Sequence, residues 1–212
     1  MSFERQIAPP QQGLEFRGGL AAGTDLRGPF GARHVEHVRP GDKIVTRTGG
    51  LQPVRFVWTR TLGPEQMRDN PALAPVRLRP RAIGPMMPQR ELVVAPDHRL
   101  LIPGHRIAGA EGEAGVLVEA HEIAGRSRGA SVSAREAAVT FYQLVFDSHQ
   151  ILTANGLPVE SFLPTPSALA SLDPELRAAL LERFVTLGKA PGAYPPASFR
   201  VMSGVDLLPP PF

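Results

Sequence analysis

The sequence predicts an all-β domain over residues 18–164, followed by one amphipathic helix. Three observations favour this fold class. Short apolar runs recur through the range, glycine, proline and aspartate separate them at close spacing, and no apolar period of helical length interrupts them. Hydrophobic residues make up 42% of the chain and charged residues 20%, so the composition supplies a packed core and argues against bulk disorder.

The predicted elements begin after an N-terminal arm. Residues 1–17 carry Pro9-Pro10 and Gln11-Gln12 without a period, which is typical of an arm or linker. The turn Arg39–Asp42 precedes the strand-like KIVTR, and Gly49-Gly50 separates it from a second strand, PVRFVWTRT, which predicts a hairpin. Four further runs are strand candidates: VRLRP (76–80), ELVVAPDHRLLIPG (91–104), GVLVEAHEI (115–123) and VTFYQLVFDSHQILTANG (139–156).

The composition changes after Pro164. Asp173 supplies a helix N-cap with Pro174 at the first helical position, and Gly188 supplies a stop. Between them apolar residues recur at helical spacing: Leu176, Leu180, Phe184 and Leu187. The pattern predicts a helix over 174–187, within an appendage of residues 165–188 that docks on the β domain. Residues 189–212 then form a tail with too much proline for regular structure.

Charge and residue usage exclude several classes of function. The excess of 23 Lys+Arg over 20 Asp+Glu is small and no basic block occurs, which argues against a nucleic-acid partner. No run approaches the ~18 apolar residues of a membrane span, and the N-terminus lacks a signal-peptide core, so we expect no membrane partner and a cytoplasmic protein. The chain has no cysteine, which excludes disulfides, thiolate zinc sites and cysteine nucleophiles.

Four stretches, taken together and in order, resemble a known family. They are GTDLRGPFGARHVEHVRPGDKIVTRTGG, LQPVRFVWTRT, ELVVAPDHRLLI and FDSHQILTANGLPVESFLP. The chain is similar over about residues 18–164 to the Hint (Hedgehog/intein) domain family, and in particular to its bacterial stand-alone branch. The resemblance implies a horseshoe-like β-fold and, as the family's activity, autoproteolysis or protein splicing without a cofactor.

The chemistry of self-cleavage needs three parts. A thiol or hydroxyl on the first domain residue attacks the carbonyl just before it and converts the amide to a thioester or ester. A histidine polarises or protonates the departing nitrogen, and a second acid or base completes the reaction.

His98 occupies the position of the family's conserved histidine in VVAPDHRLLI. Strand parity places it on the same face as Val94 and Leu100. The family has Thr or Ser three residues earlier, whereas this chain has Ala95, so the hydroxyl that helps orient the imidazole is missing. A plain strand histidine held by a backbone hydrogen bond is the alternative interpretation.

Asp147 and His149 are candidates for the second acid or base. They are two residues apart in VFDSHQI, and strand parity places both on one face, within reach of each other or of His98. A solvated strand end is the alternative. Asn155-Gly156 resembles the terminal asparagine of an intein, but the chain continues beyond it, which favours a tight turn.

The nucleophile is missing from its expected position. Aligning Gly23-Thr24 with the Gly-Thr of the family places Gly19 where the cysteine belongs. The residues on either side offer no thiol or hydroxyl: Arg17, Gly18, Leu20 and Ala21. Thr24 is the nearest hydroxyl, although it belongs to the start of a matched strand.

Three hypotheses follow. The first is a Hint domain that has lost self-cleavage and acts as a binding or scaffolding module. Its partner is unknown, and a protein is one candidate. The second is an active autoproteolytic domain with an unusual nucleophile such as Thr24. The third is a metal hydrolase that uses several ligands: His98, His121, His149 and Asp147. For the first two, we expect His98, Asp147 and His149 to cluster near Gly19 and Thr24 in one shallow pocket.

Overall fold

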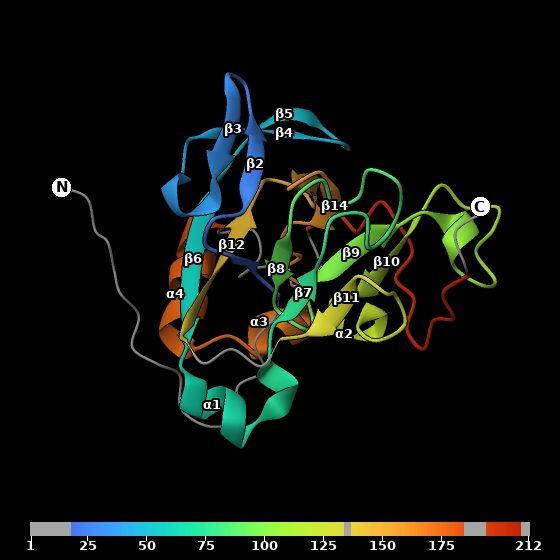
Figure 1. The fold of residues 1–212 in the computed structure, drawn as a ribbon. Helices are drawn as coiled ribbons and strands as arrows, with labels where there is room; N and C mark the ends of the chain where they lie inside the picture. The colour runs from blue at the N-terminus through green and yellow to red at the C-terminus, as the bar shows by residue number, and fades with distance from the viewer. Residues whose placement is uncertain (1–17, 134–136, 185–193, 209–212) are drawn as a thin grey trace.

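The computed structural model describes residues 18–133, 137–184 and 194–208. Two six-stranded sheets and one separate hairpin form the body of the protein (Figure 1). The first sheet has the order β11 (Ala130–Val132), β7 (Val76–Leu78), β8 (Leu92–Val94), β1 (Leu20–Ala21), β12 (Val139–Val145) and β6 (Phe56–Leu62). The second has the order β10 (Val116–Glu119), β9 (Arg99–Ile102), β14 (Leu157–Glu160), β13 (Ile151–Ala154), β2 (Asp25–Gly28) and β3 (Gly31–His34). The hairpin pairs β4 (Lys43–Thr46) with β5 (Gly50–Pro53).

All pairings between these strands are antiparallel, which agrees with the predicted all-β class. The largest cluster of buried apolar side chains draws on both sheets, with Leu20 and Leu92 from the first and Leu100 and Leu157 from the second. The sheets therefore share one core, which burial of apolar surface stabilises.

Several predicted strands are interrupted in the structure. The run 91–104 divides into β8 and β9, because a turn at Pro96-Asp97 carries the chain from the first sheet to the second. The run 139–156 divides into β12 and β13, with a bend over 146–150. In these places sequence alternation continues past the point where the backbone changes sheet, so parity does not carry across the break.

A helical segment also replaces the end of one predicted strand, 115–123. Residues 120–123 form α2 (Ala120–Ile123) directly after β10, and α1 (Pro64–Asp69) follows β6. The predicted hairpin of KIVTR with PVRFVWTRT is wrong beyond Pro53. The partner of β4 is β5, the chain leaves this hairpin after Pro53, and β6 pairs with β12 instead. Two short helical turns, η1 (Val35–His37) and η2 (Pro71–Leu73), complete the connections in the N-terminal half, and η3 (Gly104–Arg106) follows β9.

The C-terminal helix is present, preceded by the short α3 (Pro166–Ala170). In α4 (Pro174–Arg183) the Asp173 carboxylate accepts hydrogen bonds from the amides of Glu175 and Leu176, as predicted for an N-cap. Leu176 and Leu180 are buried against an apolar cluster that includes Trp58 and Phe162. The helix ends at Arg183, before the predicted end at 187, and Leu187 lies outside the described residues.

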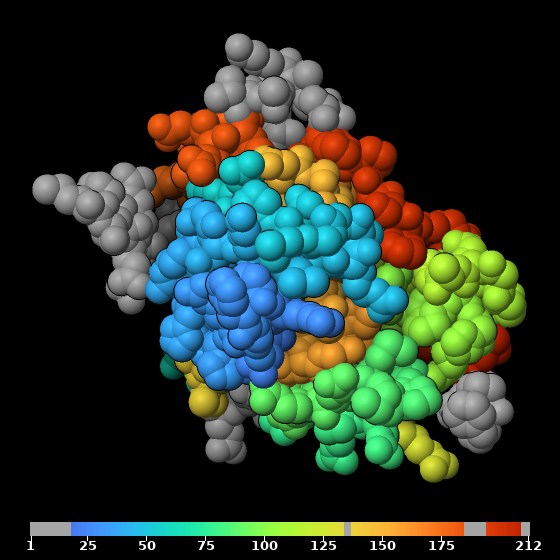
Figure 2. Space-filling view, turned by 90° about the horizontal axis from the view of Figure 1, so that it is seen from above, coloured from blue at the N-terminus to red at the C-terminus, as the bar shows by residue number. Residues whose placement is uncertain are grey.

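The described part of the tail lies along the body of the protein beside β10 (Figure 1). Leu117 forms an isolated bridge with Val201, and Ile107 forms another with Leu207. Seen from above, the N-terminal strands and the segment around residues 80–100 lie on either side of part of the C-terminal half (Figure 2). In the described ranges, no helix has the length and apolar character to cross a bilayer.

Candidate functional site

The chain enters the domain at two glycines, Gly18 and Gly19, directly before β1. Their φ angles are 69° and 140°, a region of backbone conformation that favours glycine. The carbonyl of Gly19 accepts a hydrogen bond from the amide of Ala95, at 2.9 Å. Leu20 then pairs with Val94 on one side and Tyr142 on the other. The first residues of the domain are therefore fixed in the middle of a sheet.

Two consecutive side chains bind the amides of these two glycines. The amide of Gly18 donates to Oδ1 of Asp97 at 2.9 Å, and the amide of Gly19 donates to Nδ1 of His98 at 3.0 Å. We call these four residues the amide clamp. Asp97 and His98 lie between β8 and β9, and both face the start of β1. The amide clamp therefore depends on the segment in which the chain passes from the first sheet to the second.

His98 is 1% exposed, and this burial sets its protonation state. Burial lowers the pKa of His98 to about 4; the charge of Glu160 opposes this shift and that of Arg99 adds to it. The imidazole is therefore neutral near pH 7. Since Nδ1 accepts the Gly19 amide, the hydrogen resides on Nε2, which is buried and has no hydrogen-bond partner among the described residues.

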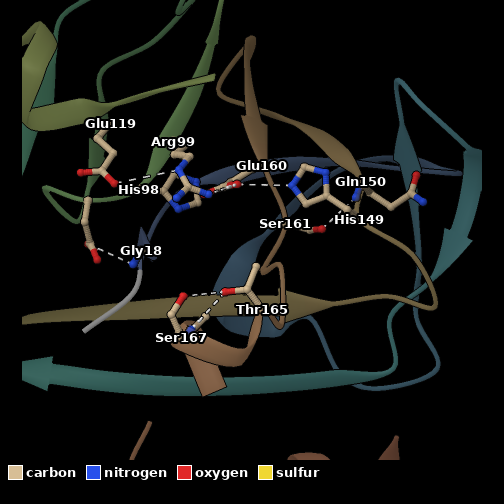
Figure 3. A network of polar contacts seen from close by, with 12 residues as sticks. Gly18, His98, Arg99, Glu119, His149, Gln150, Glu160, Ser161, Thr165 and Ser167 are labelled. Atoms are coloured by element: carbon tan, nitrogen blue, oxygen red, sulfur yellow. Dashed lines mark hydrogen bonds and ion pairs between the residues drawn. The ribbon is translucent and has the colours of Figure 1, made fainter. Parts of the chain in front are cut away.

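A small pocket of about 50 Å³ lies beside Gly18. Glu160 is its central charged group: Arg99 pairs with it at 3.5 Å and Nε2 of His149 at 3.3 Å (Figure 3). Arg99 also faces Glu119 at 3.9 Å. The lining consists of Gly18, Asp97, Arg99, Glu119, Gln143, Glu160, Phe162, Leu163, Thr165, Ser167 and Ala168.

Among the residues predicted from the sequence, His149 contacts Glu160, whereas His98 only senses the charge of this carboxylate. His149 is 3% exposed and its imidazole contacts Glu160, whose charge also acts on His98. Asp147, by contrast, pairs with Arg55 at 2.6 Å, and its side chain is 57% exposed. The expected inward orientation of Asp147 is therefore wrong. The physical reason is the bend after β12, which removes the strand parity on which that expectation rested.

Thr24 is buried, and its hydroxyl donates to the carbonyl of Ala21 at 2.6 Å. It therefore closes the turn between β1 and β2. Asn155 and Gly156 have φ angles of 47° and 87° and link β13 to β14, so the predicted tight turn is confirmed.

Three further residues of this site did not emerge from the sequence: Asp97, Gln143 and Glu160. Asp97 directly precedes the recognised histidine, and Glu160 belongs to the matched stretch ending VESFLP, so a signal existed for both. Gln143 lies in the middle of β12 and no local pattern distinguishes it.

The ligand set of the metal hypothesis is not assembled. His121 lies on α2, where Nδ1 is 3.4 Å from Glu119 and 3.2 Å from the carbonyl of Pro96. Within the ranges that the structure describes, no group of three or more metal-ligating side chains comes together.

The chain has similarities to known proteins at the level of sequence family and of solved structures. No curated protein matches the chain. Among solved structures, the chain is similar to the MchDnaB-1 intein, with 14% identity, a TM-score of 0.42 and coverage of 66% of this chain and 98% of the intein. It is also similar to a bacterial intein-like domain from Clostridium thermocellum, with 13% identity, a TM-score of 0.40 and coverage of 70% and 100%. The sequence profile described as "Hint domain" matches residues 19–166, which is more than half of the chain. The chain belongs to the Hint domain family.

Proposed function

We propose that this protein is a Hint domain that does not cleave itself, and that its site holds the chain at Gly18-Gly19 without covalent chemistry. One observation carries the proposal. Nδ1 of His98 faces the amide nitrogen of Gly19, and Gly19 has no side chain with which to attack the preceding carbonyl. The histidine is aimed at a peptide bond that has no internal nucleophile.

The missing atom cannot be replaced by the rest of the site. An acyl shift from nitrogen to oxygen or sulfur passes through a five-membered ring, which requires the nucleophilic atom on the β-carbon of the residue that follows the bond. Gly19 has only hydrogens on its α-carbon. Neither His98 nor His149 supplies such an atom in that ring.

The backbone supports the same conclusion. Gly18 and Gly19 adopt φ angles that other residues adopt at a cost of about 1–3 kcal/mol each. A cysteine or serine at position 19 would have to accept that cost or move away from the present conformation. The junction is therefore built for two glycines.

The protonation state of His98 also suits a binding role. A neutral imidazole that accepts the Gly19 amide orients this amide, but it has no proton on Nδ1 to give to a departing nitrogen. Together with Asp97, it satisfies the amides of Gly18 and Gly19 at the entry to the sheet, which fixes these two residues. A scaffolding role for a protein partner would use this fixed geometry.

Cleavage by Thr24 is the alternative that the experiment must address. Its hydroxyl is committed to Ala21, and its own amide donates to the same carbonyl at 3.2 Å. The imidazole of His98 is occupied at Gly19. Cleavage before Thr24 would proceed without the histidine that activates the bond.

Intact-mass measurement tests the proposal. The purified full chain is incubated at neutral pH with a thiol or with hydroxylamine, and we expect a single full-length mass. A fragment that begins at Gly19 would overturn the proposal, and one that begins at Thr24 would support the alternative. Hydroxylamine also attacks Asn-Gly bonds, so a fragment that begins at Gly156 reports separate chemistry and is identified by its own mass.

A further inference from the structure

We infer that this site accepts only glycine at the position before the bond that His98 faces, and that Gln143 is the residue that enforces this choice. The inference rests on the proposed role of the site in holding the Gly18 and Gly19 amides, and it names the class of chain that the site can hold. That class is a polypeptide whose last residue before the bond is glycine.

The space around Gly18 carries the inference. A β-carbon built at this position would lie 2.4 Å from Nε2 of Gln143 and 2.9 Å from Nδ1 of His98. Both distances are well inside the van der Waals contact of about 3.5 Å or more for such atoms. Any residue other than glycine would therefore have to displace both side chains, and Gln143, the nearer one, by the larger amount.

Neither neighbour has room to move without loss. Gln143 is 4% exposed and lies on β12 opposite Trp58 of β6. It also interacts with another group of the protein, which a displacement would disturb. His98 is 1% exposed, and a shift of its ring would break the hydrogen bond to Gly19. A side chain at position 18 would thus disturb the bond on which the proposed function depends.

The backbone angle alone does not explain this selectivity, and a second glycine allows the two effects to be separated. Gly23 has a φ angle of 81°, close to the 69° of Gly18, but a β-carbon at Gly23 would meet no atom within 4 Å. Replacement of Gly23 with alanine therefore measures the cost of the left-handed conformation without a steric contact.

The test compares four variants of the full chain: Gly18→Ala, Gly23→Ala, Gln143→Ala and the double variant Gly18→Ala/Gln143→Ala. Thermal unfolding gives Tm, and nitrogen-15 NMR of the imidazole reports the Gly19–His98 bond. We expect Gly18→Ala to lower Tm by about twice as much as Gly23→Ala, or more, and to shift the His98 Nδ1 resonance, which Gly23→Ala leaves in place. In the Gln143→Ala background, we expect a clearly smaller effect of Gly18→Ala on Tm.

Two results would overturn the inference. One is a Gly18→Ala effect no larger than that of Gly23→Ala. The other is an effect of Gly18→Ala that Gln143→Ala does not reduce, including the case in which the single and the double variant both fail to fold. These readouts do not involve cleavage, so they fail independently of the intact-mass experiment on the proposed function.

Discussion

Nδ1 of His98 lies 3.0 Å from the amide nitrogen of Gly19, a residue 79 positions earlier in the chain. This contact connects a loop between two sheets with the first residue of the matched domain. It also locates the peptide bond at which the chemistry of the family would begin in this chain. The position of Gly19 relative to His98 therefore allows direct tests.

Replacement of Gly19 with cysteine tests whether the missing nucleophile alone prevents cleavage. We expect Gly19→Cys to yield a slowly formed fragment that begins at residue 19 when a thiol is added, because the imidazole already contacts this amide. The rate will be limited by the φ angle of 140° at this position and by the neutral state of His98. Mass spectrometry over time provides the measurement.

Gly19→Ala is the matched control for this experiment, since it brings the same backbone strain without a thiol, and it should remain intact. A second variant pairs Gly19→Cys with Ala95→Ser, which restores the hydroxyl that the family has before the histidine. Ala95 is fully buried, so serine, with one added atom, is easier to accommodate than threonine. A folded Gly19→Cys/Ala95→Ser protein that stays intact would show that the site lacks more than its nucleophile.

The β domain was predictable because its signals are local. Turns at Gly49-Gly50 and Asn155-Gly156 and the N-cap at Asp173 are each encoded within a few residues, and the structure has them where they were expected. His98 is identifiable because the segment around it, VVAPDHRLLI, resembles the corresponding segment of the Hint family. The sequence could not show which glycine its imidazole contacts until strand pairing was known.

The rest of the site depends on contacts between distant segments. Strand alternation assigns Asp147 to the inner face, but the chain bends after β12 in a segment that contains neither glycine nor proline, the strongest turn signals. Glu160 lies in a matched stretch but carries no sign there of its partners, and Gln143 has the pattern of an ordinary strand residue. Packing of β12 and β14 near Gly18 gives both residues their place in the site. Long-range topology, which local patterns do not encode, made these residues part of the site.

The low pKa of His98 predicts that stability falls in acid. The pKa is about 4 in the folded protein and about 6.5 in the unfolded chain, so the unfolded state binds the proton first. Protonation of His98 in the unfolded chain therefore does not affect stability above pH 6.5. As the pH falls toward 4, it lowers the free energy of unfolding by about 3 kcal/mol in all. Urea unfolding at pH 7, 6, 5 and 4 gives the dependence.

His98→Gln should flatten this part of the pH profile, whereas His105→Gln should not. His105 is exposed and serves as the control for loss of one histidine. Equal profiles for His98→Gln and the unmodified protein would contradict the assignment of the acid sensitivity to His98.

Asp97 should stabilise the junction through its bond to the Gly18 amide. Asp97→Ala removes the acceptor, and we expect a loss of about 1–2 kcal/mol in the free energy of unfolding, because a hydrogen bond to a charged group is lost. Asp97→Asn keeps an oxygen at this position and should cost less than half as much. Chemical denaturation provides the values.

Asp147→Ala is the matched control for Asp97. Its ion pair with Arg55 is solvent-exposed, and such pairs contribute little to stability. We therefore expect a much smaller change than for Asp97→Ala. A larger loss from Asp147→Ala than from Asp97→Ala would reverse the assignment of the two carboxylates.

Glu160 provides a test of the electrostatic connection between the pocket and the amide clamp. Its negative charge raises the pKa of His98, against the larger effect of burial. Glu160→Gln removes the charge and keeps the size of the side chain, so the pKa of His98 should fall below its present value of about 4. NMR titration of the imidazole measures this directly.

Glu119→Gln is the control, because Glu119 pairs with Arg99 and His121 and is not among the charges that act on His98. A pKa of His98 that rises in Glu160→Gln, or that moves equally in both variants, would mean that Glu160 is not the carboxylate that His98 senses.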